Sequence, residues 1–254
     1  MVKAVFFDFD HTLYSHKTMS IPQSARDAIK ALQSKGILCV LATGRHKVEL
    51  GNFPDAFNVG LDGFVTIDGQ LCLDRNAKTI CRNEITGDLK DELLRLFEAK
   101  DHHVILIEED RMYANIPRES VTPGMTNIRH GVGTYTGNPL YMGVVYIEPH
   151  QEALLQERIP SGRFLRWGQP GVDVVPPGRD KVAGINAFLK YHNLEGAQYI
   201  AFGDGLNDID MIKSAPIGIA MGNAQSEVKK VADHVTTDIE DNGIYNALVH
   251  LGLI

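Results

Sequence analysis

The feature of this sequence that most constrains its fold is the alternation of short apolar runs with amphipathic helical patterns. Residues 4–9 form an apolar run, a helical pattern extends from about Pro22 to Gly36, and residues 37–42 form the next apolar run. Strands that alternate with helices in this way build parallel sheets covered on both faces. The alternation returns from residue 181 onward. We therefore expect an α/β protein with a Rossmann-like core and a mainly parallel sheet.

The middle of the chain has a different pattern. Between residues 84 and 176, several strand-like runs are clustered with two helical patterns, and Pro176-Pro177-Gly178 follows them. Such a mixture indicates an α+β domain and not a further strand–helix–strand unit, and a length of 254 residues allows two domains. The sequence therefore predicts a discontinuous core of residues 1–83 and 177–254, with an α+β cap domain inserted at 84–176.

Charge and hydropathy exclude several classes of function. The 25 Lys and Arg residues against 32 Asp and Glu give a formal net charge of −7, and the basic residues form no block. The electrostatic footprint of a nucleic-acid or membrane binder is therefore missing. The apolar runs are far shorter than the ~18 residues of a membrane span, and the N-terminus leads directly into a strand-like run instead of a signal peptide. We expect a cytoplasmic protein whose partner is a small molecule, and the sequence is silent on its oligomeric state.

The three cysteines predict no redox or metal site. Cys39, Cys72 and Cys81 are odd in number and form no C-x-x-C pair, and Cys39 lies within an apolar run. Buried free cysteine behaves as a small apolar side chain. We expect all three to be reduced structural thiols.

Chemically active side chains follow the first two expected strands. Asp8 and Asp10 emerge two residues apart from the run at 4–9, and Thr12 follows them. Ligands of open α/β sheets bind beyond the carboxyl ends of the strands, so these positions favour a site. Thr43-Gly44-Arg45 follows the second strand, where a hydroxyl and backbone N–H groups suit a phosphate oxygen. The alternative is that Thr43 is only a helix N-cap.

Two further segments lie at similar places in the second half of the core. Lys181 opens a helical pattern, where its charge opposes the helix dipole and indicates a compensating anion, although a solvated surface lysine is the alternative. Residues 203–208, Gly-Asp-Gly-Leu-Asn-Asp, directly follow an expected strand. Their Asp and Asn oxygens are ligands suited to Mg²⁺, and the alternative is a glycine-rich turn capped by acidic side chains.

In their order along the chain, these segments resemble the four motifs of the haloacid dehalogenase (HAD) superfamily of phosphohydrolases. The insert is similar to the large α+β (class IIB) cap of the Cof-type subfamily, so the resemblance covers the whole chain. It implies a Mg²⁺-dependent phosphatase that acts on small phosphorylated metabolites, sugar phosphates above all, through a phosphoaspartyl intermediate. The matching segments are Asp8-x-Asp10-x-Thr12, Thr43-Gly44-Arg45, Lys181 and Gly203-Asp204-Gly205-x-Asn207-Asp208.

The resemblance also implies a role for each motif residue. Asp8 would be the nucleophile, since a carboxylate can form an acyl phosphate and divide one difficult displacement into two. Asp10 would protonate the leaving oxygen and then activate water, and its backbone carbonyl would contact the metal. The implied metal ligands are Asp8, Asp10, Asp204 and Asp208, and the implied phosphate-binding residues are Thr43, Gly44, Lys181 and Asn207.

The sequence departs from the family pattern at two places. His11 stands where the subfamily usually has glycine, and its side chain could narrow the space beside the nucleophile, bond the substrate or Asp10, or point to solvent. Asp68-Gly69-Gln70 stands where relatives often have Asn-Gly-Ala, so we expect altered substrate contacts near the site entrance. The residues considered for substrate contact are His11, Arg45, Arg118, Arg129 and Arg166.

Two alternatives to hydrolysis remain open from the sequence. Relatives with similar caps also transfer the phosphoryl group to a sugar, so a phosphotransferase or phosphomutase is the first alternative. A mutase would bind a second phosphate in its cap, where the arginines of this chain form no obvious cluster. The second alternative is a non-catalytic phospho-ligand sensor. Retention of Asp10 argues against it, because a module that only stores phosphate needs no acid or base beside the acceptor.

Overall fold

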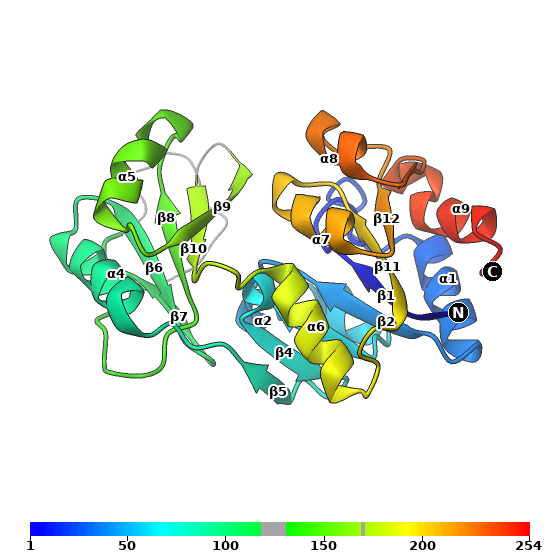
Figure 1. Ribbon diagram of the computed structural model, residues 1–254, viewed down its shortest axis with the longest axis horizontal. Coiled ribbons are helices and arrows are strands. Elements are labelled where there is room, and N and C mark those ends of the chain that lie inside the picture. The colour runs from blue at the N-terminus through cyan, green and yellow to red at the C-terminus, as the bar shows by residue number, and fades with distance from the viewer. Residues whose placement is uncertain (118–130, 169–170) are drawn as a thin grey trace. The chain divides into compact units, whose positions relative to one another are not determined.

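The computed structural model describes residues 1–117, 131–168 and 171–254. Two compact units divide the chain: Met1–Arg82 together with Asp180–Ile254, which we call the core unit, and Asn83–Arg179, which we call the cap unit. The junctions therefore lie at 82/83 and 179/180, where the sequence predicts 83/84 and 176/177. Each unit is described by itself below (Figure 1).

The core unit contains one mainly parallel sheet, whose described strands follow the order β13-β12-β11-β1-β2-β3-β4-β5. Pairing is parallel from β13 through to β3, whereas β3–β4 and β4–β5 are antiparallel. The strands are β1 (Val2–Phe7), β2 (Leu38–Ala42), β3 (Gly63–Thr66), β4 (Leu71–Asp74), β5 (Thr79–Arg82), β11 (Gln198–Gly203), β12 (Ile217–Ala220) and β13 (His234–Val235).

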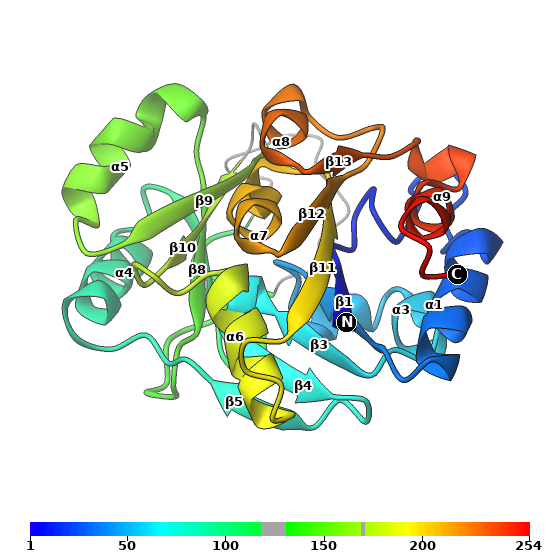
Figure 2. The same ribbon diagram turned by 45° about the vertical axis from the view of Figure 1, so that its right-hand side comes forward.

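Helices cover both faces of this sheet. Alternate residues of β1 point to opposite faces: Phe7 packs into the apolar cluster that contains α1 and α9, and Phe6 into the cluster that contains α6 and α7. Figure 2 shows α1 beside α9, and α6 against β3 and β4. No helix in the described parts of the chain has the length and apolar character of a membrane span. The helices are α1 (Gln23–Ser34), α2 (Lys47–Leu50), α3 (Pro54–Asn58), α6 (Lys181–Tyr191), α7 (Ile209–Ser214), α8 (Ser226–Val231) and α9 (Gly243–His250), with 3-10 turns η1 (Ile67–Gly69), η4 (Leu206–Asp208) and η5 (Ile239–Asp241).

Strand order brings the sequence motifs to one edge of the sheet. β1 pairs in parallel with β11 on one side and with β2 on the other. The carboxyl ends of these three strands therefore lie at the same edge. Asp8 follows β1, Thr43 follows β2, and Asp204 follows β11.

The cap unit is an antiparallel sheet with helices packed on one face. Its described strands follow the order β7-β6-β8-β10-β9, and every pairing is antiparallel. Leu93 of α4 lies in one apolar cluster with Val104 and Val145 of the sheet. The predicted fold class, an α/β core with an α+β insert, is confirmed. The elements are α4 (Gly87–Ala99), β6 (His103–Ile107), β7 (Met112–Ala114), β8 (Met142–Tyr146), η3 (Pro149–Gln151), α5 (Glu152–Arg158), β9 (Arg163–Gly168) and β10 (Gly171–Val175).

The prediction of three reduced thiols is wrong for two of them. Cys72 and Cys81 form a disulfide, with Cα atoms 5.0 Å apart. The reason is the register of β4 and β5, which places the two cysteines directly opposite each other. The sequence pattern does not reveal β5, and without that strand the two cysteines have no evident proximity. Cys39 is a buried free thiol, and burial raises its pKa.

Candidate active site

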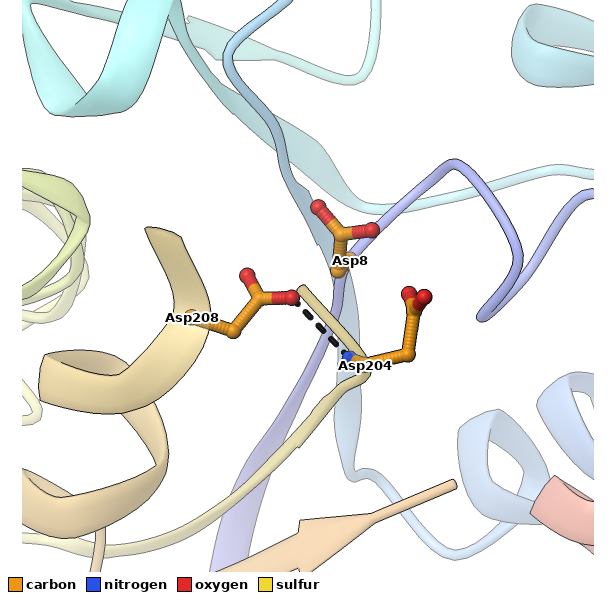
Figure 3. Close-up of side chains that lie close together, drawn as sticks. All are labelled: Asp8, Asp204 and Asp208. Carbon is orange, nitrogen blue, oxygen red and sulfur yellow. Dashed lines mark hydrogen bonds between the residues drawn. The ribbon is translucent and has the colours of Figure 1, made fainter. Parts of the chain in front are cut away.

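Three carboxylates from two segments gather at the carboxyl edge of the core sheet. Asp8 directly follows β1, and its N–H donates to the carbonyl oxygen of Phe202 in β11 at 2.9 Å. Asp204 and Asp208 lie in the loop that follows β11. Each of the three acids offers an oxygen, and these oxygens lie within 4.8 Å of one another (Figure 3). Three acids of the first and fourth motifs therefore share one cluster.

Lys181 provides the positive charge of this cluster. It is the first residue of α6 and is buried, and its Nζ donates to Asp8 Oδ1 and Asp208 Oδ1 at 2.7 Å each. The N-cap of α6 is Asp180, whose carboxylate accepts from the N–H of Val182 at 2.9 Å. The alternative of a solvated surface lysine is therefore wrong.

The loop after β11 is folded around the carboxylate of Asp208. Asp208 Oδ2 accepts the N–H of Asp204 at 3.0 Å, the dashed line in Figure 3. It also accepts the N–H of Gly205 at 3.0 Å, in agreement with an acid-capped turn. A Cβ at Gly203 would lie 2.6 Å from Asp208 Cβ, so only glycine allows this approach. Asn207 is half-buried, and its Oδ1 would lie 2.7 Å from a Cβ at Gly205. The Asp208 carboxylate therefore binds the backbone of its own loop through Oδ2 and Lys181 through Oδ1.

Thr12 is a site residue to which the sequence analysis assigned no role. It is fully buried, and its Oγ1 donates to Asp204 Oδ1 at 2.8 Å. The signal was present, because Thr12 is the last residue of the D-x-D-x-T pattern. Its bond orients Asp204 within the cluster.

Burial and mutual repulsion shift the pKa values of the acids in the cluster. Burial, followed by the charge of Asp208, raises the pKa of Asp8 well above its ordinary value. The same two causes raise the pKa of Asp204 to about 7. Burial disfavours the ammonium form of Lys181, but the neighbouring carboxylates, Asp208 first, outweigh it and raise its pKa. When all three carboxylates are ionised, the single ammonium group leaves an excess of negative charge, and the hard oxygen atoms of the acids fit a divalent cation.

Asp10 lies beside this cluster in a different environment. Arg45 donates to both of its oxygens, Nε to Oδ2 at 2.6 Å and Nη2 to Oδ1 at 2.7 Å. His16 Nε2 donates to Oδ1 at 2.6 Å. Burial alone would raise the pKa of Asp10, but hydrogen bonds from His16 and Arg45 outweigh it and hold that pKa well below its usual range. Arg45 is one of the residues that the sequence indicates as possible substrate contacts, whereas His16 belongs to no motif and the sequence does not single it out.

The structure selects among the placements that were open for His11. Its side chain is exposed, and its ring centroid lies 4.7 Å from that of His16. The backbone has φ of 59°, a left-handed conformation that glycine adopts without steric cost. The carbonyl oxygen of His11 accepts a bond from Asn223 Nδ2 at 2.8 Å. The His11 imidazole therefore packs against the His16 ring and is otherwise exposed to solvent.

Thr43 and Gly44 form the loop that presents Arg45. Thr43 is buried, and its Oγ1 accepts the N–H of Arg45 at 3.1 Å. The alternative that Thr43 is the helix N-cap is wrong, because His46 caps α2. The Arg45 guanidinium lies 4.6 Å from the ring centroid of Phe53. The second motif thus directs its arginine to Asp10.

The segment 68–70 influences the site through Lys181. Burial lowers the pKa of Lys181, and the charges of Asp208 and Asp8 raise it. The charge of Asp68, which is fully buried in η1 with φ of 47°, adds to that rise. A Cβ at Gly69 would lie 2.1 Å from the carbonyl oxygen of Asp180, so this segment packs closely under the start of α6.

Of the three cap arginines considered for substrate contact, Arg166 lies in the described part of the chain. Arg166 Nε donates to Glu152 Oε2 at 2.8 Å, an ion pair within the cap unit. One edge of the Arg166 guanidinium is therefore bound by a residue of the same unit. Arg118 and Arg129 lie outside the described residues.

Comparisons with known proteins agree with this geometry. The family profile of haloacid dehalogenase-like hydrolases matches residues 5–248, and the chain belongs to that family. It is 30% identical over 258 residues to YkrA of Bacillus subtilis (strain 168), covering 99% of this chain and 98% of that protein.

Two solved structures are similar over nearly the whole length of both chains. The phosphatase BT1666 from Bacteroides thetaiotaomicron has a TM-score of 0.88 and 31% identity, with 100% of this chain and 96% of that chain covered. The HAD subclass IIB sugar phosphatase BT4131 has a TM-score of 0.86 and 30% identity, with both chains fully covered. The predicted family and enzyme class are confirmed: the chain is a HAD-type phosphatase.

Proposed function

We propose that this phosphatase is a Mg²⁺-dependent phosphomonoester hydrolase that acts on small phosphorylated metabolites, sugar phosphates in particular. The observation that carries the proposal is the contact between a buried carboxylate and a buried ammonium group, Asp8 Oδ1 to Lys181 Nζ at 2.7 Å, beside two further acids. The cluster thereby supplies a nucleophile in Asp8, a cation for phosphoryl oxygens in Lys181, and hard metal ligands in its carboxylates. The similarity to a IIB sugar phosphatase supports the substrate class.

The reaction proceeds in two displacements at phosphorus. Because the bonds from His16 and Arg45 hold the pKa of Asp10 low in the substrate-free chain, the mechanism requires Asp10 to take up a proton when the phosphate dianion binds beside it. In the first displacement, an oxygen of Asp8 forms a bond to phosphorus while the ester P–O bond breaks, and the protonated Asp10 gives its proton to the leaving oxygen. In the second, Asp10 takes a proton from a water molecule whose oxygen attacks the phosphoryl group on Asp8. The Asp8–phosphorus bond breaks, inorganic phosphate leaves, and both carboxyl groups return to their first state.

The acids of the cluster would hold the metal. Asp8, Asp204 and Asp208 offer carboxylate oxygens, and the family resemblance adds the backbone carbonyl of Asp10. Mg²⁺, when bound, supplies positive charge that neutralises the phosphoryl oxygens and the carboxylates around them. Thr12 and the loop amides orient Asp204 and Asp208 for this purpose.

Binding of the phosphoryl group falls to Lys181 and to polar groups at the edge of the sheet. Lys181 is the buried cation in contact with Asp8, so it offsets the charge of an incoming phosphate dianion. We assign the remaining phosphoryl contacts to Thr43, Gly44 and Asn207, which follow β2 and β11 at the same edge.

The test is phosphate release from a panel of sugar phosphates, nucleotides, phospho-acids and pyridoxal phosphate, with Mg²⁺ and with excess EDTA. We expect release that requires the metal, is fastest with sugar phosphates, and is abolished by Asp8→Asn. Trapping of a phosphorylated chain by acid quench and mass spectrometry would place the phosphoryl group on Asp8. Release that survives Asp8→Asn would contradict the covalent mechanism, and transfer of phosphate to a sugar without hydrolysis would favour the phosphotransferase alternative.

A further inference from the structure

The chain turns back on itself directly after Asp10, and this turn brings His16 onto the Asp10 carboxylate. Asp10 and Tyr14 form an isolated parallel bridge. Ser15 and Ser20 exchange backbone hydrogen bonds at 3.0 and 3.2 Å, which closes the turn. Backbone contacts on both sides therefore determine where His16 lies.

The Asp10 carboxylate accepts bonds from two different segments. Arg45 donates to both oxygens and lies in the loop after β2, whereas His16 donates to Oδ1 from the turn after β1. The planar fork of an arginine defines the plane of a carboxylate, but the two side chains can still move together. The bond from His16 provides a second anchor that limits this movement.

Aromatic rings determine the orientation of the His16 imidazole. Its centroid lies 4.7 Å from that of His11, 5.3 Å from that of Tyr14 and 6.4 Å from that of Phe53. Phe53 also lies under the Arg45 guanidinium, so one ring supports both donors. The side chain of His16 is 32% exposed, so water partly screens its hydrogen bond to Asp10. That polar contact is with the residue that the mechanism needs to orient.

We propose that His16 is a positioning residue, which holds the Asp10 carboxyl group in the orientation from which it exchanges a proton with the leaving oxygen. The inference rests on the proposed acid/base role of Asp10. A reacting group displaced by about 1 Å can cost up to about 10²-fold in rate. Loss of the His16 donor frees the carboxyl group to turn away from the leaving oxygen, and it also raises the pKa of Asp10, which that bond lowers. We expect the loss of orientation to dominate, so that proton transfer weakens while the nucleophile and the acidic cluster stay as they are.

The experiment compares two classes of ester in the metal-loaded enzyme. A sugar phosphate has an alkoxide leaving group that needs a proton, whereas an aryl phosphate with an acidic phenol does not. Because kcat/KM covers only the steps up to transfer of the phosphoryl group to Asp8, it reports on leaving-group protonation. We expect His16→Phe, which keeps the ring and removes the donor, to lower kcat/KM about 10-fold for the sugar phosphate and less than about 2-fold for the aryl phosphate.

Two further variants separate hydrogen bonding from packing. His16→Gln retains an N–H donor and is expected to recover most of the kcat/KM for the sugar phosphate. His250→Phe, the same exchange at an exposed histidine of α9, is expected to change neither ester. Equal losses for both esters in His16→Phe, no loss for either, or a His16→Gln variant as slow as His16→Phe would each overturn the assignment of His16.

Asp10→Asn distinguishes a failure of this inference from a failure of the proposed mechanism. If Asp10→Asn lowers kcat/KM by the same factor for both esters, the general-acid role of Asp10 is wrong. If Asp10→Asn lowers kcat/KM selectively for the sugar phosphate and His16→Phe does not, only the role of His16 is wrong.

Discussion

The hydroxyl of Thr12 donates to Asp204 Oδ1 at 2.8 Å, across 192 residues of sequence. This bond joins the turn after β1 to the loop after β11, and it favours the ionised form of a carboxylate whose pKa burial raises. Groups that orient metal ligands typically contribute about 10–100-fold to metal affinity. We therefore expect Thr12→Val to raise the Mg²⁺ concentration for half-maximal activity at least about 10-fold.

The measurement is a Mg²⁺ titration of phosphatase activity at saturating substrate. Thr12→Ser, which retains the hydroxyl, is the control and should stay close to the parent enzyme. An unchanged Mg²⁺ requirement in Thr12→Val would mean that Asp204 needs no orientation by this bond.

Much of the core could be predicted from sequence because its strands are buried on both faces and read as continuous apolar runs. Polar residues directly after such runs, Asp8 and Asp204 among them, are placed by the topology of a parallel sheet. Lys181 could be placed in the same way, because it opens the helix that follows the inserted unit. These three residues meet in the structure for the reason that the sequence pattern indicates.

Contacts between loops could not be predicted in this way. The bonds of Asp10 to His16 and Arg45 depend on how a turn and a neighbouring loop fold over one another, and no periodicity encodes that. The Cys72–Cys81 disulfide likewise depends on the register of an edge strand that carries no strong apolar pattern. Tertiary geometry decides such pairs, and residue type alone does not.

His11 is expected to destabilise the folded state through its backbone. A side chain in the left-handed conformation costs about 1–2 kcal/mol relative to the right-handed one, and His11 has φ of 59°. We expect His11→Gly to raise the melting temperature by about 2–4 °C, as measured by circular dichroism. Gly36→Ala, at φ of 73° and with no atom within 4 Å of the added Cβ, should lower the melting temperature by a similar amount. A lower melting temperature in His11→Gly would mean that the contact with His16 outweighs the backbone cost.

Gly203 is required by the close approach of Asp208. A Cβ there would lie 2.6 Å from Asp208 Cβ, and overpacking of this kind costs about 1–3 kcal/mol. We expect Gly203→Ala to displace the carboxylate that binds Lys181, with a loss of stability in urea denaturation and a fall in kcat of at least about 10-fold. Gly131→Ala, where no atom lies within 4 Å of the added Cβ, should behave like the parent enzyme. Full activity in Gly203→Ala would show that the position of Asp208 is not critical.

The metal-free protein should become less stable as pH rises through the range in which Asp204 ionises. Its pKa is raised from 3.8 to about 7 in the folded state, so between these values the folded chain binds more protons than the unfolded chain. Stability therefore falls with rising pH from about 4 to about 7, and Asp8 acts in the same direction. Mg²⁺ competes with these protons, so the increase in melting temperature that Mg²⁺ produces should be larger at pH 8 than at pH 5.5. Asp204→Asn should weaken both dependences, and a Mg²⁺ effect that is larger at pH 5.5 would contradict the raised pKa.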